Sequence, residues 1–367
     1  GYSSGDQFVF STSVVERNLF GKGQSLSATF DVGTARQDFV VSFTEPYLYD
    51  SPLTVGFDAF NTEREFTDFD SRKTGLAMRT SYPFKRLVFP FVKRWKKDPA
   101  NEEAYDQPVS MLDYMRGGMS YELTREKIDN IDSDAPIVIQ DEEGKSLTSS
   151  VTPNLSYDSR DHFFTPTEGT SSGLSFKFAG LGGDSRFIKS DARARWYYSF
   201  LKDPNWGGTY TVALGGNLGY GVGLAERDNG KKNLPLFERY FPGGINSVRG
   251  FRERSLGPRA KSDCDSSSPP VCASTEVVGG DKQAILNVEL MFPVAEQYGI
   301  LGVAFFDMGQ AFSDSESISF GQFRRSVGFG GRWLSPFGPL RVELGFPLNK
   351  QPDDETSVLG FSLGAQP

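Results

Sequence analysis

The sequence predicts an all-β protein, and within that class a transmembrane antiparallel β-barrel. First, apolar and polar residues alternate with period two along nearly the whole chain of 367 residues. Second, many alternating segments run for about ten residues or more, the length that a tilted strand needs to cross a bilayer. Third, aromatic residues cluster near segment ends, as at Tyr47, Trp196 and Trp333, which is typical of membrane barrels. A soluble β-sandwich stays open as an alternative, because its strands also have one apolar face.

About fifteen segments carry this alternation. They begin near residues 6, 24, 37, 53, 73, 111, 147, 170, 187, 208, 282, 300, 322, 338 and 355. Between Asp191 and Phe200, for example, aromatic and small apolar side chains share one face, and mostly polar side chains share the other. No segment has a helical period over about ten residues, so the sequence predicts no substantial helix.

One segment does not fit the strand pattern. Residues 87–97 are apolar and then basic, and Pro90 interrupts them, which a central strand does not accept well. We therefore interpret residues 85–110 as a surface insertion. An interfacial anchor, with its lysines near anionic headgroups, is the alternative.

The composition excludes several classes of protein. The 47 acidic and 39 basic residues give a net charge of −8, which argues against nucleic acid as a partner. No apolar run approaches the roughly 18 residues of a membrane helix, so a membrane-spanning form of this chain must be a closed barrel. Gly1 does not begin a signal peptide, so we expect a mature protein or a fragment.

The two cysteines, Cys264 and Cys272, lie in one polar segment. Their closeness and the absence of other thiols from the sequence indicate a disulfide and an oxidising compartment, and two free thiols are the alternative. A zinc site is not expected, because the sequence has no second cysteine pair and its one histidine, His162, is distant. We interpret His162 as a solvated turn residue, since no nucleophile motif accompanies it. We expect no metal, no cofactor and no enzyme activity.

The longest segment without a strand pattern spans residues 225–281. Its central part, residues 237–259, holds too many glycines, prolines and charges for a strand. A long loop in an all-β chain is usually either functional or disordered. Aromatic residues such as Tyr240 and Phe251 supply large apolar side chains that this loop can bury, which favours an ordered and functional loop.

The loop contains the motif Val248-Arg249-Gly250-Phe251. With its flanking residues, this motif resembles the long sixth loop of BamA-type outer-membrane assembly barrels, which belong to the POTRA-barrel superfamily. Four residues alone are a weak pattern. Further matches follow in the same order along the chain, at residues 18–23, 158–169, 306–309 and 335–340. Together they extend the resemblance over essentially the whole chain.

The resemblance implies a sixteen-stranded barrel that follows POTRA domains. No POTRA sequence is present, and residues 1–5 resemble the end of the first strand. We therefore expect one barrel domain over residues 1–367, with about fifteen strands and most of the first strand missing. Leu359, Phe361 and Leu363 are implied to lie in the closing strand, at its seam with the first. The family usually ends on an aromatic residue, whereas residues 365–367 are Ala-Gln-Pro.

The resemblance also implies that the loop of residues 225–281 is extracellular and folds into the lumen. There Arg249 is implied to contact acidic groups at the positions of Glu289 and Asp307. The alternation supports this independently, because Glu289 lies on the polar face of its segment and Asp307 interrupts an apolar one. A guanidinium bonds a carboxylate through two parallel contacts, which lysine cannot reproduce. Without the resemblance, we would interpret Arg249 as an ordinary exposed loop arginine.

The function that the resemblance implies is that of an insertase. The seam between the first and last strands opens sideways, and the exposed edge pairs with a strand of an unfolded client protein. The implied partners are the lipid bilayer, outer-membrane client proteins and the lipoproteins of an assembly complex. The implied location is the outer membrane of Gram-negative bacteria. A two-partner secretion transporter and a passive porin are the alternatives.

Overall fold

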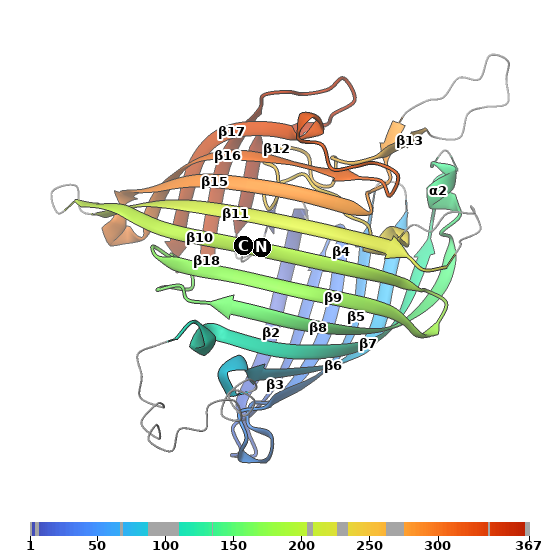
Figure 1. The fold of residues 1–367 in the computed structure, drawn as a ribbon, viewed down its shortest axis with the longest axis horizontal. Coiled ribbons are helices and arrows are strands. Elements are labelled where there is room, and N and C mark those ends of the chain that lie inside the picture. The colour runs from blue at the N-terminus through green and yellow to red at the C-terminus, as the bar shows by residue number, and fades with distance from the viewer. Residues whose placement is uncertain are drawn as a thin grey trace, which may run out of the picture.

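The fold is shown in Figure 1, which draws a computed structural model of the chain. The structure describes residues 2–3, 7–66, 69–86, 110–133, 135–203, 208–225, 234–261, 275–336 and 338–363. Cys264, Cys272, residues 87–109 of the insertion and residues 365–367 lie outside these ranges, so the predictions for them stay predictions.

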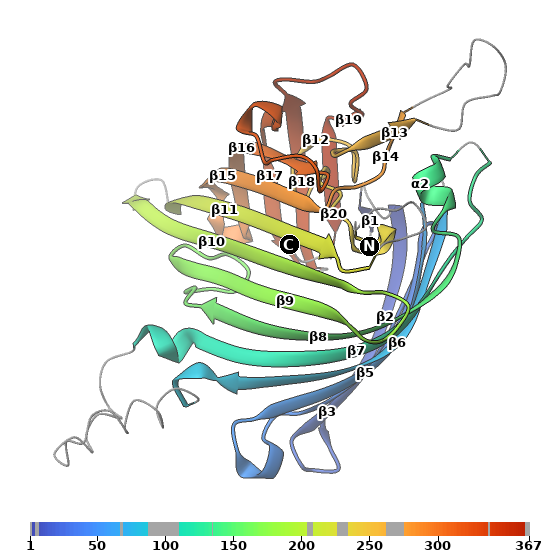
Figure 2. The ribbon, with the colours of Figure 1, turned by 45° about the vertical axis from the view of Figure 1, so that its right-hand side comes forward.

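Sixteen strands of the described residues form one closed barrel, in which neighbours along the chain pair antiparallel (Figures 1 and 2). They are β1 (Tyr2–Ser3), β2 (Gln7–Leu19), β3 (Gln24–Gly33), β4 (Arg36–Glu45), β5 (Thr54–Glu65), β6 (Asp70–Pro83), β7 (Met115–Asp129), β8 (Gly144–Asp158), β9 (Gly169–Gly183), β10 (Phe187–Asp203), β11 (Gly208–Gly223), β15 (Lys282–Ala295), β16 (Ile300–Phe312), β17 (Arg324–Ser335), β18 (Gly338–Pro347) and β20 (Leu359–Leu363). The barrel closes where β1 pairs with β20 through Tyr2 and Ser3. The predicted antiparallel barrel is confirmed, and Tyr2 and Ser3 are the residues of its first strand that the structure describes.

The largest differences from the predicted strand starts are at β7 and β20. Instead of a strand from residue 111, Met111–Tyr114 form a short 3-10 helix, η3, whose first turn is capped by Ser110 and Asp113. Instead of a barrel strand from residue 355, Thr356–Ser357 form β19, which pairs with the long loop and not with the wall. In both places local contacts override the strand pattern.

The two ends of the barrel differ in their connections. One end, here called the loop end, carries most of the long connections. Its elements are α2 (Ile137–Gln140), η4 (Leu236–Glu238), β12 (Gly250–Phe251), β13 (Arg259–Lys261), β14 (Thr275–Val277), η6 (Phe320–Gln322) and β19 (Thr356–Ser357). The opposite end carries shorter turns, the short helices η1 (Leu48–Asp50), η3 and η5 (Glu296–Tyr298), and one long connection, residues 84–114 between β6 and β7. Figures 1 and 2 show α2 and β13 together at the loop end.

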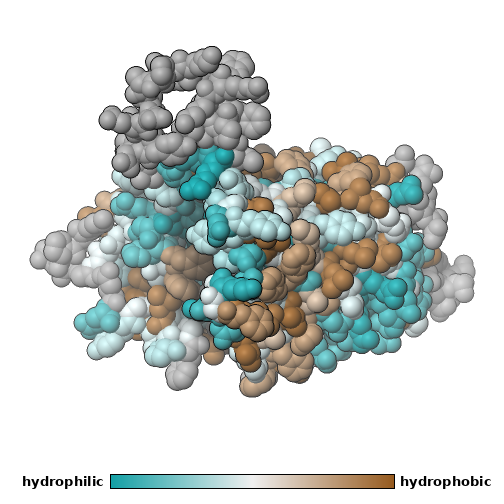
Figure 3. Space-filling model, turned by 90° about the horizontal axis from the view of Figure 1, so that it is seen from below, coloured by the Kyte–Doolittle hydropathy of each residue, from teal (hydrophilic) through white to brown (hydrophobic). Residues whose placement is uncertain are grey.

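The outer wall of the barrel exposes apolar side chains. On β10, Trp196, Tyr198 and Phe200 are 41%, 52% and 52% exposed, and the residues between them face the other way. Figure 3 shows patches of hydrophobic side chains on this face, with hydrophilic ones at both ends and in a strip between the patches. An exposed apolar surface of this extent is typical of a protein face that contacts a membrane or a partner protein. Among the described residues, no helix is long and apolar enough to cross a membrane.

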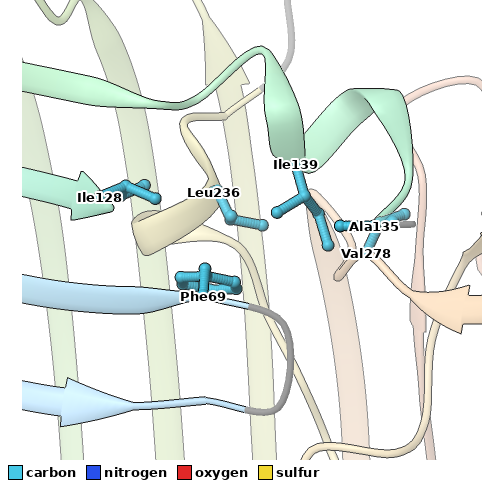
Figure 4. Packing of buried hydrophobic residues seen from close by; sticks show 6 residues of the cluster. All are labelled: Phe69, Ile128, Ala135, Ile139, Leu236 and Val278. Atoms are coloured by element: carbon cyan, nitrogen blue, oxygen red, sulfur yellow. The ribbon is translucent and has the colours of Figure 1, made fainter. Parts of the chain in front are cut away.

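Several clusters of buried apolar residues lie where the long loop meets the wall. One cluster joins Val248, Phe251 and Leu256 of the loop to Ile285 of β15. Another joins loop and wall residues at the loop end (Figure 4). Its members are Phe69, Ile128, Ala135, Ile139, Leu236 and Val278. The described part of the loop is therefore packed against the wall, as its aromatic content predicts.

Candidate functional site

The loop between β11 and β15 folds back on itself before it meets the wall. Its two limbs are joined by a bridge between Tyr240 and Gly280 and by the pairing of β13 with β14. At its tip, the Ser247 hydroxyl donates to the Gly243 carbonyl (2.8 Å) and accepts from the Gly243 N–H (2.7 Å). Such a closed turn fixes the direction of the motif that follows it. Val248 and Phe251 are fully buried.

Arg249 is the centre of a buried ion cluster, which we call the Arg249 anchor. Its Nε and Nη2 donate to the two oxygens of Asp307, each over 2.6 Å. Its Nη1 lies 2.7 Å from Glu289 Oε1 and 3.0 Å from Glu343 Oε2. The guanidinium also stacks on Phe305, with 3.5 Å between its carbon and the ring centroid. The pairing with Asp307 is the planar fork that only arginine makes.

The three acids come from three different strands, β15, β16 and β18. They are nearly inaccessible to solvent, with 2%, 0% and 1% exposure for Glu289, Asp307 and Glu343. Burial by itself lowers the pKa of Arg249, but the hydrogen bond and charge of Asp307 and the charges of the two glutamates raise it above its ordinary value. The loop guanidinium therefore stays charged inside the barrel.

Further arginines of the wall complete the cluster. Arg332 of β17 lies 2.7 Å from Glu289 and 2.8 Å from Glu343. Arg341 of β18 lies 3.0 Å from Glu343, and Arg195 of β10 lies 3.0 Å from Glu289. Four arginines thus face three acids, which leaves a formal charge of +1. Every buried carboxylate has a cation beside it, which a stable buried cluster requires.

A second cluster, here called the Glu238 anchor, fixes the first limb of the loop to another part of the wall. Glu238 of η4 lies 2.6 Å from Lys177 of β9 and 3.2 Å from Lys189 of β10. Burial by itself raises the pKa of Glu238, but the two lysines hold it below its usual value. Nearby, the Tyr240 hydroxyl donates to Asp191 over 2.9 Å. Burial and the Asp191 charge raise the pKa of Tyr240, so its hydroxyl stays protonated.

Apolar contacts seat the loop between these anchors. Figure 4 shows Leu236 of η4 and Val278 of the second limb beside Ile139 of α2 and the ends of β6 and β7. The short helix α2 therefore covers the loop from the solvent side. Charge fixes the position of the loop, and burial of these side chains stabilises it further.

The structure brings the predicted motif residues and both predicted acids together. Val248 and Phe251, which flank Arg249 and Gly250 in the sequence, are buried in one apolar cluster, and Glu289 and Asp307 bind Arg249 directly. The sequence reasoning missed Glu343 and the wall arginines of the Arg249 anchor. The signal for Glu343 was present, because the segment from Leu340 to Phe346 alternates and places Glu343 on its polar face. No comparable signal marked Glu238, since a loop has no periodicity.

The predicted seam residues lie in β20, next to the barrel closure. Leu359, Phe361 and Leu363 stand opposite residues 344, 342 and 340 of β18. This pairing extends over five residues, whereas β17 and β18 pair over ten. Over the part of the chain that the structure describes, β20 therefore has a shorter ladder with β18 than β17 has. His162 lies in the exposed turn between β8 and β9, as predicted.

The whole chain is similar to known proteins. It is 31% identical over 369 residues to the outer membrane protein assembly factor BamA of Nitratidesulfovibrio vulgaris (strain Hildenborough), covering 99% of this chain and 40% of that protein. It is 24% identical to BamA of Neisseria meningitidis serogroup B, covering 99% of this chain and 46% of that protein. The chain thus spans less than half the length of these curated relatives.

A solved structure has a similar fold. The crystal structure of BamA from Haemophilus ducreyi lacking POTRA domains 1–3 matches with a TM-score of 0.76 at 19% identity, covering 98% of this chain and 68% of that chain. The sequence profile of the Omp85 superfamily domain matches residues 18–366. The predicted family resemblance is therefore confirmed, and the chain belongs to the Omp85 superfamily.

Proposed function

We propose that this chain is the membrane-embedded barrel of an outer-membrane protein assembly factor. It lies in the outer membrane of a Gram-negative bacterium and helps other β-barrel proteins to fold into that membrane. The observation that carries the proposal is the similarity along 99% of the chain to a protein named as such an assembly factor. The apolar outer wall supports the location, because it fits the hydrocarbon region of a bilayer.

The mechanism we propose depends on the closing strand. Among the described residues, the seam between β1 and β20 is paired only through Tyr2 and Ser3, so few backbone hydrogen bonds join these two strands. A strand that separates at this seam exposes unpaired N–H and C=O groups, and these groups are a template for an incoming strand. The client strand gains backbone hydrogen bonds before it leaves the seam. No covalent chemistry, metal or nucleotide enters this mechanism.

The proposed partners follow from the same chemistry. The lipid bilayer covers the apolar wall, and unfolded outer-membrane proteins supply the strands that pair at the seam. Accessory lipoproteins of an assembly complex are a further proposed partner. The net charge of −8 gives no support to a nucleic-acid partner.

A passive porin is the less favoured alternative, because described residues of the loop bind several strands of the wall. Arg249 reaches the walls formed by β15, β16 and β18, and Glu238 reaches β9 and β10 on another side. A planar-bilayer recording with a large and steady conductance would favour the porin. A two-partner secretion transporter also needs a barrel and a loop, and export of a secreted substrate by the full-length protein would favour it.

The test of the proposal is client folding into liposomes. We expect the full-length protein to accelerate the folding of an unfolded outer-membrane barrel by about tenfold or more, which corresponds to a barrier lower by ~1.4 kcal/mol. The control is an unrelated porin, reconstituted at the same protein-to-lipid ratio. Equal folding rates in the two preparations, with accessory lipoproteins also supplied, would contradict the proposed function.

A further inference from the structure

The segment that follows Arg249 is joined directly to the chain that enters the closing strand. β12 pairs with β19, so that Gly250 stands opposite Ser357 and Phe251 opposite Thr356. The Arg252 N–H continues this pairing and donates to the Glu355 carbonyl over 3.0 Å. A single residue separates β19 from β20. The loop motif is therefore paired with the segment that leads into the closing strand.

Two glycines let this sheet lie directly on the wall. Gly250 has a φ of +90°, which glycine adopts without strain. A Cβ on Gly345 of β18 would lie 2.5 Å from the Gly250 nitrogen, so the two backbones are in contact. The Gly345 N–H donates to the Val358 carbonyl over 2.8 Å, at the point where the chain enters β20. The loop thus crosses β18 where β20 begins.

A loop side chain also covers β20 itself. Ile245 is 6% exposed, and its Cδ1 would lie 3.2 Å from a Cβ on Gly360. Arg341 of the Arg249 anchor donates to the Ile245 carbonyl over 3.3 Å, which ties this contact to the ion cluster. A cavity of about 30 Å³ remains between the loop and these strands, with room for about two water molecules.

We infer that Ile245, Gly250 and Gly345 position the closing strand, so that the seated loop holds the loop end of β20 in the wall. This inference rests on the proposed function, because it concerns the seam at which client strands pair. The pairing of β20 with β18 ends at Leu359 and Leu344, so beyond this point the loop contacts supply a substantial part of what fixes the loop end of β20. Unseating the loop frees that end, and the seam then separates more easily.

The test is hydrogen exchange of the full-length protein in lipid nanodiscs, followed by mass spectrometry of peptides that cover residues 356–363. Gly345→Ala pushes β12 off β18, and Ile245→Ala removes the cover from Gly360. We expect each substitution to accelerate exchange in residues 356–363 by about tenfold or more, the change that ~1.4 kcal/mol of local destabilisation gives.

Gly118→Ala is the matched control. A Cβ on Gly118 of β7 would lie 2.4 Å from the Thr80 carbonyl oxygen, so this substitution is equally crowded but distant from β20 in the strand order. We expect it to accelerate exchange in β6 and β7 and to leave residues 356–363 unchanged. If Gly345→Ala does not fold, Ile245→Ala decides the test by itself.

The outcomes separate this inference from the proposed function. Unchanged exchange in residues 356–363 of a folded Ile245→Ala protein overturns the positioning role, whatever the client assay gives. The same acceleration in Gly118→Ala as in Gly345→Ala overturns it too, because the effect is then general destabilisation. Faster exchange in the two loop variants alone supports it, even where the wild-type protein fails the client-folding assay and the proposed function is lost.

Discussion

The loop is held to the barrel wall at two anchors of opposite polarity. At the Arg249 anchor, a loop cation lies among three acids from β15, β16 and β18. At the Glu238 anchor, a loop anion lies between two lysines from β9 and β10. Because the charges are reversed, the two loop residues cannot exchange places. The pair of anchors therefore fixes the direction in which the loop is seated as well as its position.

The two anchors also differ in geometry. Arg249 offers a rigid planar fork that bonds both oxygens of Asp307, while the lysines at Glu238 are flexible point charges. The Arg249 anchor includes β18, the neighbour of the closing strand, whereas β9 and β10 are remote from the seam in strand order. We infer that the first anchor controls the seam and that the second holds the base of the loop.

The largest expected effect is that of Arg249→Ala. Among the described residues, Asp307 then keeps two hydrogen-bond donors, the side-chain amide of Asn287 at 2.8 Å and the backbone N–H of residue 249 at 3.1 Å, but it loses its direct partner cation, and its carboxylate is completely buried. Leaving a buried charge without its partner costs about 3–5 kcal/mol. We expect a lower unfolding temperature, reduced heat-modifiability on gels and faster proteolysis of the loop. Arg249→Lys, which keeps the charge and loses the fork, serves as the control and should lose less. Unchanged loop proteolysis in Arg249→Ala would show that this anchor does not seat the loop.

Glu238→Gln tests whether the second anchor is weaker. The amide still accepts a hydrogen bond but removes the charge between Lys177 and Lys189, and we expect a loss of about 2–3 kcal/mol. The double variant with Arg249→Ala sharpens the comparison. If the loop seats as one unit, the second substitution costs less than it does alone. Full additivity of the two losses in thermal unfolding would mean that the anchors act independently.

The sequence predicted the fold better than the site, for a physical reason. A strand exposes its period in the sequence, so the alternation located the barrel strands, and the same rule assigned Glu289 to the inner face. Glu343 follows the same alternation, but the family resemblance implied contacts of Arg249 with Glu289 and Asp307 only. Glu238 could not be predicted from the sequence. Its lysine partners lie 61 and 49 residues away, and a loop sequence does not indicate which strands its residues will contact.

Tyr240→Phe is expected to have a smaller effect at neutral pH. It removes the hydrogen bond from the hydroxyl to Asp191, at a cost of about 1–2 kcal/mol. The pKa of Tyr240 is raised in the folded protein, so its contribution is complete below the ordinary tyrosine pKa of ~10 and is lost as pH rises above it. Thermal unfolding between neutral and alkaline pH should therefore decline less steeply in Tyr240→Phe than in the wild type. Parallel curves would show that this hydroxyl does not titrate with unfolding.

The smallest expected effect is a difference between the two anchors at acidic pH, where Glu238 loses its charge and Arg249 keeps its own. The lysines hold the pKa of Glu238 below its ordinary value, so its contribution is complete above the unfolded pKa of ~4.3 and is lost as pH falls through the lower folded value. The Arg249 guanidinium has a raised pKa and stays charged throughout this range. Other carboxylates titrate as well, so the informative quantity is the difference in unfolding temperature between wild type and Glu238→Gln. We expect this difference to narrow as pH falls below ~4, because the protonated glutamate and the amide are then both neutral. A difference that stays constant would mean that Glu238 contributes through its packing in η4 and not through its charge.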